Sequence, residues 1–393
     1  MKKTMLMLLA LIMSVSMGAM DFEEDGISYD ILSSDDRTVE VVNNNSAYVG
    51  DVVIPARVSH DGTTYTVAAI HFQAFFKCTD LYSVSIPETV TDMGRYSFTQ
   101  CTSLQEVTLP KNATAIPDGM FWGCTSLKTI KLPSGVTEIG EYAFANCSVL
   151  GDINLPSGLV FLGKAALMGT AIQNFTLPIG ITEVSPYLLA LTTKLSSVTL
   201  HNKLATIGEC AFQGNTQLKT IDIPESVTII EASAFAQCPQ LESITIPDGV
   251  TLLPEKCFYN DMALRRIVIG KGVTAIGADC FARYKNTTTA PRLEDVYLQS
   301  DAIVSGGESF LDEACAKATL HVPSSLVEAY KAQPGWQRFS IVAIKDGELS
   351  GIGSVKTNAA ACKAAYTIGG MRCAKAQRGI KIVDGKKIIS NIN

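Results

Sequence analysis

Hydrophobic residues return along this chain with a period of about 23 residues. A short phrase, Leu-x-x-(Val/Ile)-x-(Ile/Leu) with Pro after most copies, recurs ten times. Successive copies start 23 residues apart, except for one step of 22 and one of 29 residues, and the longer step inserts six residues near 284–292. The copies start at Leu81, Leu104, Leu127, Leu150, Ile172, Leu195, Leu218, Leu241, Leu264 and Leu293. A fixed period in this range is the sequence signature of a repeat architecture.

Three other positions keep the same period. An apolar residue, often followed by Gly, stands at Ile70, Met93, Ile116, Ile139, Leu162, Val184, Ile207, Ile230, Leu253 and Ile276. A large apolar residue stands at Phe75, Phe98, Phe121, Phe144, Leu167, Phe212, Phe235, Phe258 and Phe281. Three residues before the Leu come Cys78, Cys101, Cys124, Cys147, Asn215 and Cys238. Chance does not hold four positions in phase over about 200 residues.

Each unit predicts two extended segments and a turn segment. Alternation places Val107 and Leu109 on one face of a strand, with Glu106 and Thr108 on the other. A following Pro ends the strand because it has no N–H. Val-Thr-x-Ile-Gly predicts a second extended piece and a turn glycine, and Ala-Phe-x-x-Cys predicts a short helical or 3₁₀ segment. One such coil cannot bury its apolar side, but stacked coils form a continuous core.

The repeated unit resembles the BspA-like class of leucine-rich repeats of Bacteroidetes. Residues 124–144 and 238–258 follow Cys-x-x-Leu-x-x-Ile-x-Ile-Pro-x-x-Val-Thr-x-Ile-Gly-x-x-Ala-Phe closely. The match covers 48–323 and is weakest at 159–191, where Leu replaces Phe and no Cys occurs. The predicted fold is therefore an α/β repeat solenoid: a right-handed leucine-rich-repeat array of about ten 23-residue coils with capping elements.

Five segments are predicted along the chain. Residues 1–19 form a secretory signal, because Lys2 and Lys3 precede an apolar run over 5–15 and small residues follow. Residues 20–47 form an N-terminal β cap, 48–323 the repeats, and 324–346 a C-terminal cap with Trp336 over the last coil. Residues 347–393 resemble the C-terminal tails of exported Bacteroidetes proteins, some of which are sorting signals; a small accessory β unit is the alternative. No transmembrane segment is expected after signal cleavage.

Charge and cysteine usage narrow the function. The formal net charge is -6, and removal of Lys2 and Lys3 with the signal makes it -8. No basic face for nucleic acid is therefore expected. Eleven Cys in an exported chain would suggest disulfides, but most keep the repeat period and are predicted to be buried free thiols. The four His are scattered and no Cys-x-x-Cys occurs, so no metal site and no cofactor is expected.

Catalytic motifs are also missing. The sequence contains no His-Glu-x-x-His, Gly-x-Ser-x-Gly or Gly-x-x-x-x-Gly-Lys-Ser/Thr arrangement. The prediction is a protein that is not an enzyme and has no catalytic residues.

The outward face of the strands is the candidate binding site. Twelve of its twenty outward positions are Ser, Thr or Asn, so it is small and polar. The predicted ligand-binding residues, on the concave strand face, are Glu106, Lys131, Asp152, Asn154, Asp222, Arg266, Asp295 and Tyr297. Trp122 and Tyr142 are further exposed candidates on the back segments. The alternative is that Ser and Thr merely satisfy strand propensity on a solvated face.

The family resemblance implies attachment to host proteins or other bacteria. It therefore predicts a secreted or cell-surface, adhesin-like protein whose partner is an extracellular protein, from a host matrix or another bacterium. The alternative is a surface glycan-binding protein for nutrient capture. The expected location is outside the cytoplasm of a Gram-negative bacterium: secreted, on the outer surface or in the periplasm. Aromatic residues clustered on one edge would favour a glycan, and a polar strip without a pocket would favour a protein.

Overall fold

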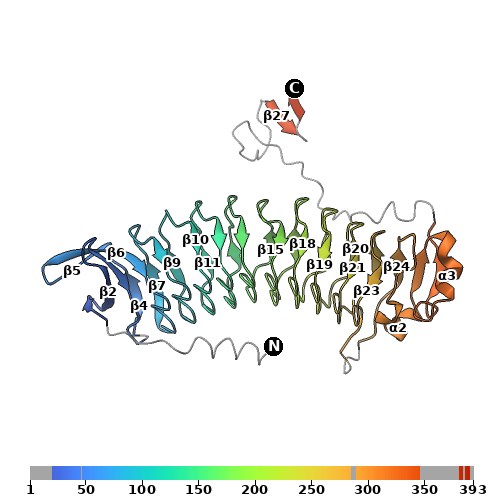
Figure 1. Cartoon of the computed structure of the whole chain (residues 1–393), viewed down its shortest axis with the longest axis horizontal. Helices are drawn as coiled ribbons and strands as arrows, with labels where there is room; N and C mark the ends of the chain where they lie inside the picture. Colours follow the sequence, from blue (N-terminus) through green and yellow to red (C-terminus); the bar gives the residue numbers. More distant parts are fainter. Residues whose placement is uncertain (1–19, 46, 285–288, 346–379, 384–385, 390–393) are drawn as a thin grey trace, which may run out of the picture. The chain divides into compact units, whose positions relative to one another are not determined.

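A computed structural model describes residues 20–45, 47–284, 289–345, 380–383 and 386–389. The chain divides into two compact units, Met1–Ile344 and Lys345–Asn393. The first is a β-solenoid of about twelve turns with a spacing of about 23 residues, which confirms the predicted solenoid (Figure 1). The predicted signal at 1–19, Cys362, Cys373 and most of the tail lie outside the described residues.

Most turns contribute one strand to the first ladder, which follows the Leu-x-x-(Val/Ile) phrase; the turn that starts at Leu218 keeps the phrase but has no assigned strand. Neighbouring strands are parallel, and their registers, such as Asn174 opposite Ser197, keep the sequence period. Its members are β4 (Gly50–Val53), β7 (Leu81–Ser85), β9 (Glu106–Thr108), β11 (Thr129–Ile130), β13 (Asp152–Ile153), β15 (Asn174–Thr176), β17 (Ser197–Thr199), β20 (Ser243–Ile246), β22 (Arg266–Ile269), β24 (Asp295–Leu298), β25 (Thr319–Val322) and β26 (Ser340–Ala343).

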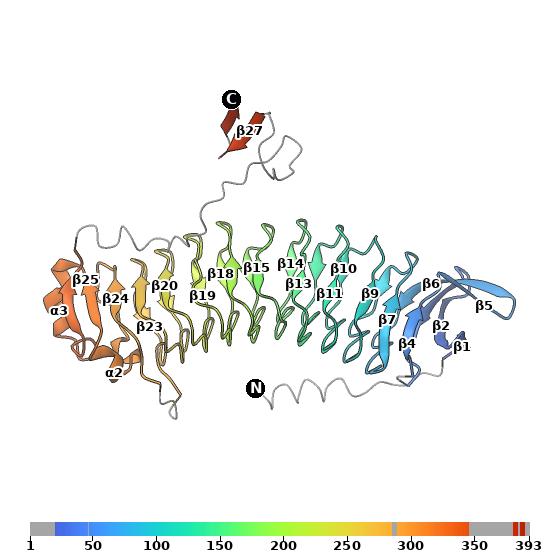
Figure 2. The ribbon, with the colours of Figure 1, turned by 180° about the vertical axis from the view of Figure 1, so that it is seen from behind.

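A second ladder of two-residue strands follows the Val-Thr-x-Ile-Gly phrase (Figure 2). Its members are β8 (Asp92–Met93), β10 (Ala115–Ile116), β12 (Glu138–Ile139), β14 (Phe161–Leu162), β16 (Glu183–Val184), β18 (Thr206–Ile207), β19 (Ile229–Ile230), β21 (Leu252–Leu253) and β23 (Ala275–Ile276).

The glycine after this strand is needed for space, not for its backbone angle. A Cβ at Gly163 would lie 2.6 Å from the Glu141 backbone nitrogen in the preceding coil, and one at Gly277 2.6 Å from that of Glu255. Neither glycine has a positive φ. Gly163 begins a hydrogen-bonded turn, as predicted, since its carbonyl accepts from the Ala166 N–H at 3.2 Å; the close approach of consecutive coils is what excludes a side chain there.

The back of each coil is a series of hydrogen-bonded turns, so the predicted helical or 3₁₀ segment is wrong there. In most turn segments two residues have positive φ; an example is Tyr142 (57°) and Asn146 (58°), which flank the Ala-Phe pair of their coil. Alternate N–H groups then donate to the next coil: Phe121 N–H to the Ala143 carbonyl at 2.9 Å and Gly123 N–H to that of Ala145 at 2.8 Å. A 3₁₀ helix would use these groups within its own coil.

The core confirms the predicted inward positions. Phe75, Phe98, Phe121 and Phe144 have no exposed surface and stack along the solenoid with centroids 4.7–5.7 Å apart. All nine described cysteines are buried and free, as predicted. Four of the repeated thiols donate to the carbonyl of the previous coil's large apolar residue, as Cys124 does to Phe98 at 3.1 Å.

The N-terminal end carries a separate sheet in the order β1 (Phe22–Glu24), β2 (Ile27–Ser33), β3 (Thr38–Val41), β6 (Thr63–Ile70) and β5 (Arg57–His60). Strand β6 also pairs with β8, so this sheet continues the second ladder. A hairpin joins β5 to β6 through Asp61 and Gly62, both with positive φ as a two-residue type I′ turn requires.

The C-terminal end is covered by aromatic residues, as expected. It contains η1 (Gly307–Ser309), α2 (Asp312–Cys315), η2 (Ser324–Leu326) and α3 (Val327–Lys331). Tyr330 and Trp336 are 0% and 2% exposed, and the Trp336 indole donates to the Val304 carbonyl at 2.8 Å. In the second unit, β27 (Ile380–Val383) and β28 (Lys386–Ile389) form an antiparallel hairpin.

Candidate binding surface

The outward side chains of the first ladder form one long polar face. The residues from Ser83 to Thr245 at these positions are defined here as the polar face. In register across β15 and β17, Asn174 lies beside Ser197 and Thr176 beside Thr199, and all four are exposed. Short hydroxyl and amide side chains repeated at the ladder spacing give a surface that can donate and accept hydrogen bonds along its length.

Four predicted binding residues lie exposed on this face: Glu106, Lys131, Asn154 and Asp222. They stand on different coils, and no ion pair found in the described ranges joins them. Of the predicted Asp152, only the backbone in β13 is described. These residues therefore contribute dispersed polar groups and do not converge on one site.

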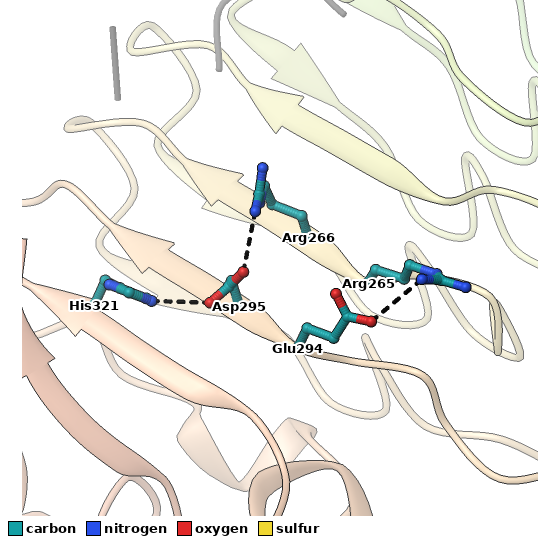
Figure 3. Close-up of polar contacts among 5 residues, drawn as sticks. All are labelled: Arg265, Arg266, Glu294, Asp295 and His321. Carbon is teal, nitrogen blue, oxygen red and sulfur yellow. Dashed lines mark hydrogen bonds and ion pairs between the residues drawn. The ribbon is translucent and has the colours of Figure 1, made fainter. Parts of the chain in front are cut away.

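Near the C-terminal coils the structure does bring predicted residues together. The Asp295 carboxylate lies 3.2 Å from the Arg266 guanidinium and 3.0 Å from Nε2 of His321 (Figure 3). In register, Arg266 stands opposite Asp295 and Tyr297 opposite His321 on the next strand. On the preceding position of the same coils, Arg265 pairs with Glu294 at 3.3 Å. Arg265, Arg266, Glu294 and Asp295, together with His321, are called the charged cluster.

The expectation that Tyr297 is exposed is wrong, because it retains only 3% of its surface. Its ring stacks on His321 with centroids 4.1 Å apart, and Val268, its neighbour on the other side in register, is 2% exposed. His321 is itself 7% exposed. It lies in β25, beyond the last copy of the repeated phrase, so the sequence period did not show that it stands beside Tyr297.

The guanidinium groups of the charged cluster remain accessible. The side chains of Arg265 and Arg266 are 51% and 48% exposed, whereas that of Asp295 is 23% exposed. The carboxylate thus holds Arg266 in place while the outer edge of the guanidinium faces solvent. A planar guanidinium fixed in this way suits a carboxylate or a backbone carbonyl of a partner.

A polar cleft adjoins this cluster. Lys219, Glu242, Arg265 and Glu294 occupy equivalent positions on consecutive coils, so opposite charges alternate along the ladder. Lys219, Glu242 and Arg292 line a cleft of about 380 Å³ beside them. Alternating charges favour a partner with its own paired charges over one of uniform sign.

The turn side of the solenoid carries a different feature, a row of aromatic residues. Phe72, Tyr96, Trp122 and Tyr142 follow one another with ring centroids 5.9, 6.5 and 5.8 Å apart, and they are called the aromatic row. A Cβ at Gly119 would clash with the Tyr96 ring, so the absent side chain makes room for it. Trp122 is 6% exposed, so the expectation that it is exposed is wrong; Tyr96 and Tyr142, which flank its ring, cover it. Phe72 is 42% exposed.

Burial also changes the acidity of the core thiols. Burial raises the pKa of the Cys147 thiol to about 12, so this sulfur stays protonated and is not a nucleophile at neutral pH. No group of three or more His, Cys, Asp or Glu side chains with metal-binding geometry occurs in the described ranges. Nor does that part of the chain include a helix long and apolar enough to cross a membrane.

Two parallel ladders, a turn ladder and a stacked Leu/Phe core define a leucine-rich-repeat solenoid. The sequence matches the family model for the BspA type leucine rich repeat region in six copies, over residues 68–196 and 183–303. These matches span more than half of the chain, which therefore belongs to the BspA-type leucine-rich repeat family, as the resemblance predicted. No curated protein matches the sequence significantly.

Several solved structures are similar. A leucine-rich repeat protein from Bacteroides ovatus is 22% identical with a TM-score of 0.47, and the alignment covers 83% of this chain and all of that one. A leucine rich cell surface protein from Faecalibacterium prausnitzii is 22% identical with a TM-score of 0.46, covering 86% and 98%. The pneumococcal vaccine antigen PcpA is 14% identical with a TM-score of 0.50, covering 82% and 98%. At this identity, the likeness to PcpA concerns the fold alone.

Proposed function

We propose that this protein is an exported, surface-displayed binding protein of the adhesin type, which engages an extracellular protein through the polar face and the charged cluster. The observation that carries the proposal is the continuity of the polar face. Small polar side chains recur at the outward positions of successive coils, in register between paired strands such as β15 and β17, and the series leads to the Arg266–Asp295–His321 group. Such an extended surface suits a protein partner, which can form many dispersed hydrogen bonds.

Export is part of the proposal and rests on the sequence. Lys2 and Lys3 precede an apolar run over residues 5–15, as in secretory signals. A chain processed there would reach the periplasm, the outer surface or the medium of a Gram-negative bacterium. Mass spectrometry of the protein recovered from a producing cell tests this step: a mature N-terminus near residue 20 supports it, and an intact Met1 contradicts it.

A glycan ligand is the second candidate, favoured by the aromatic row. Sugar rings stack on aromatic side chains, and the ring centroids from Phe72 to Tyr142 lie 5.8–6.5 Å apart along the solenoid. The limited exposure of Trp122 weakens this candidate, since a buried indole has no free face for a sugar. The protein partner is therefore the preferred function.

Screening the mature protein in parallel against extracellular-matrix proteins and glycan arrays separates the two candidates. Any ligand found is then tested against Arg266→Ala, with Lys194→Ala, an exposed residue outside the polar face, as control. For a protein ligand we expect Arg266→Ala to weaken binding by about tenfold, as removal of a partly buried charge-assisted contact does. Tyr142→Ala should leave that binding unchanged. Binding to glycans alone, abolished by Tyr142→Ala, would contradict the proposal.

A further inference from the structure

The two ladders end differently at the N-terminal end of the solenoid. The second ladder continues through β6 into the N-terminal sheet, so its first strands have partners on both sides. The first ladder starts at β4, which pairs with β7 on one side only. Within the described residues, no strand pairs with the other edge of β4. The N-terminal sheet therefore caps one ladder and leaves the other open.

Particular backbone groups at this edge have no hydrogen-bond partner in the part of the chain that the structure describes. The Gly50 N–H donates to the Asp80 carbonyl at 2.8 Å and the Ile54 N–H to the Ser85 carbonyl at 3.0 Å, so these residues face β7. Because alternate residues of a strand direct their peptide groups to opposite sides, those of Asp51 and Val53 point away from β7. An unpaired edge of this kind is a template for another extended chain.

A cleft lies along this edge. It has a volume of about 400 Å³, and its walls come from the β1–β2 turn, from residues 47–49, and from β4 and β5. At its rim Val53 is 71% exposed and Val49 59% exposed, so two accessible apolar side chains border the cleft. The space is therefore beside the unpaired peptide groups and partly apolar.

The charge of the cleft selects the kind of strand that would fit. Glu24, Asp25 and Asp51 line it together with Arg57, so acidic groups exceed basic ones by three to one. Two of the carboxylates are held in place: Glu24 accepts from the Ser59 N–H at 2.8 Å and Asp51 from the Ser83 hydroxyl at 2.6 Å. Fixed carboxylates beside an apolar rim complement a strand in which Lys or Arg alternates with β-branched residues.

We propose that the free edge of β4 binds an extended, basic segment of a partner protein by β-strand addition. Peptide groups of the segment would pair with those of Asp51 and Val53, its apolar side chains would contact Val49 and Val53, and its basic side chains would approach Asp25 and Asp51. Main-chain pairing supplies affinity in this mode, and the side-chain positions supply specificity. This site adjoins the first coil of the polar face, where Asp51 and Val53 stand opposite Ser83 and Ser85. It is bound through the backbone groups of β4, so its test and the test with Arg266→Ala can fail independently.

A synthetic peptide probes the site directly. The probe is fluorescein-labelled Thr-Lys-Val-Lys-Val-Lys-Thr, titrated with the full mature chain and followed by fluorescence anisotropy. Its controls are the same peptide with Glu in place of Lys, and one with N-methyl groups on alternate residues, which removes the donors on one edge. We expect both controls to bind about tenfold more weakly than the probe. Equal binding of the probe and the N-methylated peptide would contradict strand addition.

Matched variants then locate the binding. Val53→Pro removes the edge N–H and is tolerated on a free edge, whereas Val53→Thr keeps the N–H and the branched shape. We expect Val53→Pro to raise the Kd for the probe about tenfold and Val53→Thr to leave it within about twofold. Equal affinities of the two variants would contradict the site; if Val53→Pro does not fold, the N-methylated peptide decides alone. If the natural chain is a dimer that Val53→Pro dissociates, and if it does not bind the peptide, then the edge of β4 pairs with a second copy of this chain. That result would overturn the proposal.

Discussion

The regular coils and the irregular coils over 159–196 build the same core from different residues. In the regular coils a Phe stack and a thiol fill the space under the turns, as with Phe235 and Phe258, whose rings are 5.4 Å apart and nearly parallel. In the irregular coils Leu167 and Leu189 take the Phe position, and both have no exposed surface. Thr192 takes the Cys position and donates to the Leu167 carbonyl at 3.3 Å, as the repeated thiols do to Phe carbonyls.

The comparison shows what each turn requires. The turn ladder passes through the irregular coils, with Leu167 N–H donating to the Leu188 carbonyl at 3.2 Å and Gly169 N–H to that of Ala190 at 2.8 Å. A coil therefore needs apolar volume at one position and a buried donor at another. It does not need Phe and Cys as such, because volume-conserving apolar changes are tolerated in cores.

Truncating the Phe stack should produce the largest effect. Phe144 is fully buried between Phe121 and the irregular coil, so Phe144→Ala leaves a cavity and is expected to reduce the free energy of unfolding by about 3–5 kcal/mol. Leu167→Ala should cost less, since fewer atoms are removed. Urea titration followed by circular dichroism measures both. A loss below about 1 kcal/mol for Phe144→Ala would mean that the stack does not support the fold.

Removing the donor of an irregular coil should have the next largest effect. Thr192→Val keeps the shape of the side chain but leaves the buried Leu167 carbonyl without this hydroxyl. The Leu167 carbonyl still accepts from the Thr170 hydroxyl at 2.9 Å, so we expect a loss of about 0.5–1.5 kcal/mol in unfolding free energy. Thr193→Val, one residue on and exposed, is the control and should change stability by less than about 0.5 kcal/mol. Equal effects of the two changes would show that the hydroxyl is not needed at this position.

Asp261 occupies the same position one coil after Cys238, and it predicts a pH dependence. Its Oδ1 accepts from the Cys238 N–H at 2.7 Å, its Oδ2 has no partner, and burial raises the pKa of this carboxyl well above its usual range. In the unfolded chain the group ionises near pH 4. Relative to higher pH, the Asp261 carboxyl therefore contributes its full stabilisation to the folded state below about pH 4. This contribution to the free energy of unfolding is lost as the pH rises through the folded-state pKa.

Substitution isolates that contribution. Asp261→Asn should remove this part of the pH dependence, so the variant gains stability relative to the natural chain as the pH is raised from 4 to 8. Urea midpoints across this range measure the difference, with Asp222→Asn, an exposed carboxyl on the polar face, as control. If the urea midpoints of Asp261→Asn and the natural chain differ by the same amount at every pH, the inferred pH dependence is refuted.

The sequence alone predicts the parts of this fold that repeat. The phase of Leu104, Phe121 and Cys124 placed them in the core, because a single coil can bury these residues only by stacking on its neighbours. The alternation over residues 104–109 also placed Glu106 on an exposed face. These features follow from periodicity, which is visible without knowing any contact.

Features that depend on the neighbour in space were not predicted. Tyr297 was assigned to the exposed face because its own strand alternates, but His321, 24 residues on, covers it. The turns were taken for 3₁₀ helix because positive φ at non-glycine residues such as Tyr142 leaves no trace in composition. The open edge of β4 likewise depends on which ladder the N-terminal sheet extends, and no residue pattern specifies this.

The smallest predicted effect tests the strain in an irregular coil. Leu191 has a φ of 60° and is 42% exposed, whereas Gly123, Gly169 and Gly214 stand at the equivalent position in other coils. A non-glycine residue in this conformation costs about 1–2 kcal/mol of folding free energy, which a change to glycine would recover. Glycine also gives the unfolded chain more conformational freedom, and this offsets about 0.5–1 kcal/mol of the recovered energy. Leu191→Gly should therefore stabilise the protein by about 0.5–1 kcal/mol in urea titration. Gly169→Ala should do the opposite, since its Cβ would lie 2.6 Å from Oδ1 of Asn146. If Leu191→Gly is destabilising instead, the irregular coil depends on the contacts of this leucine, and its departure from the repeat is required for packing.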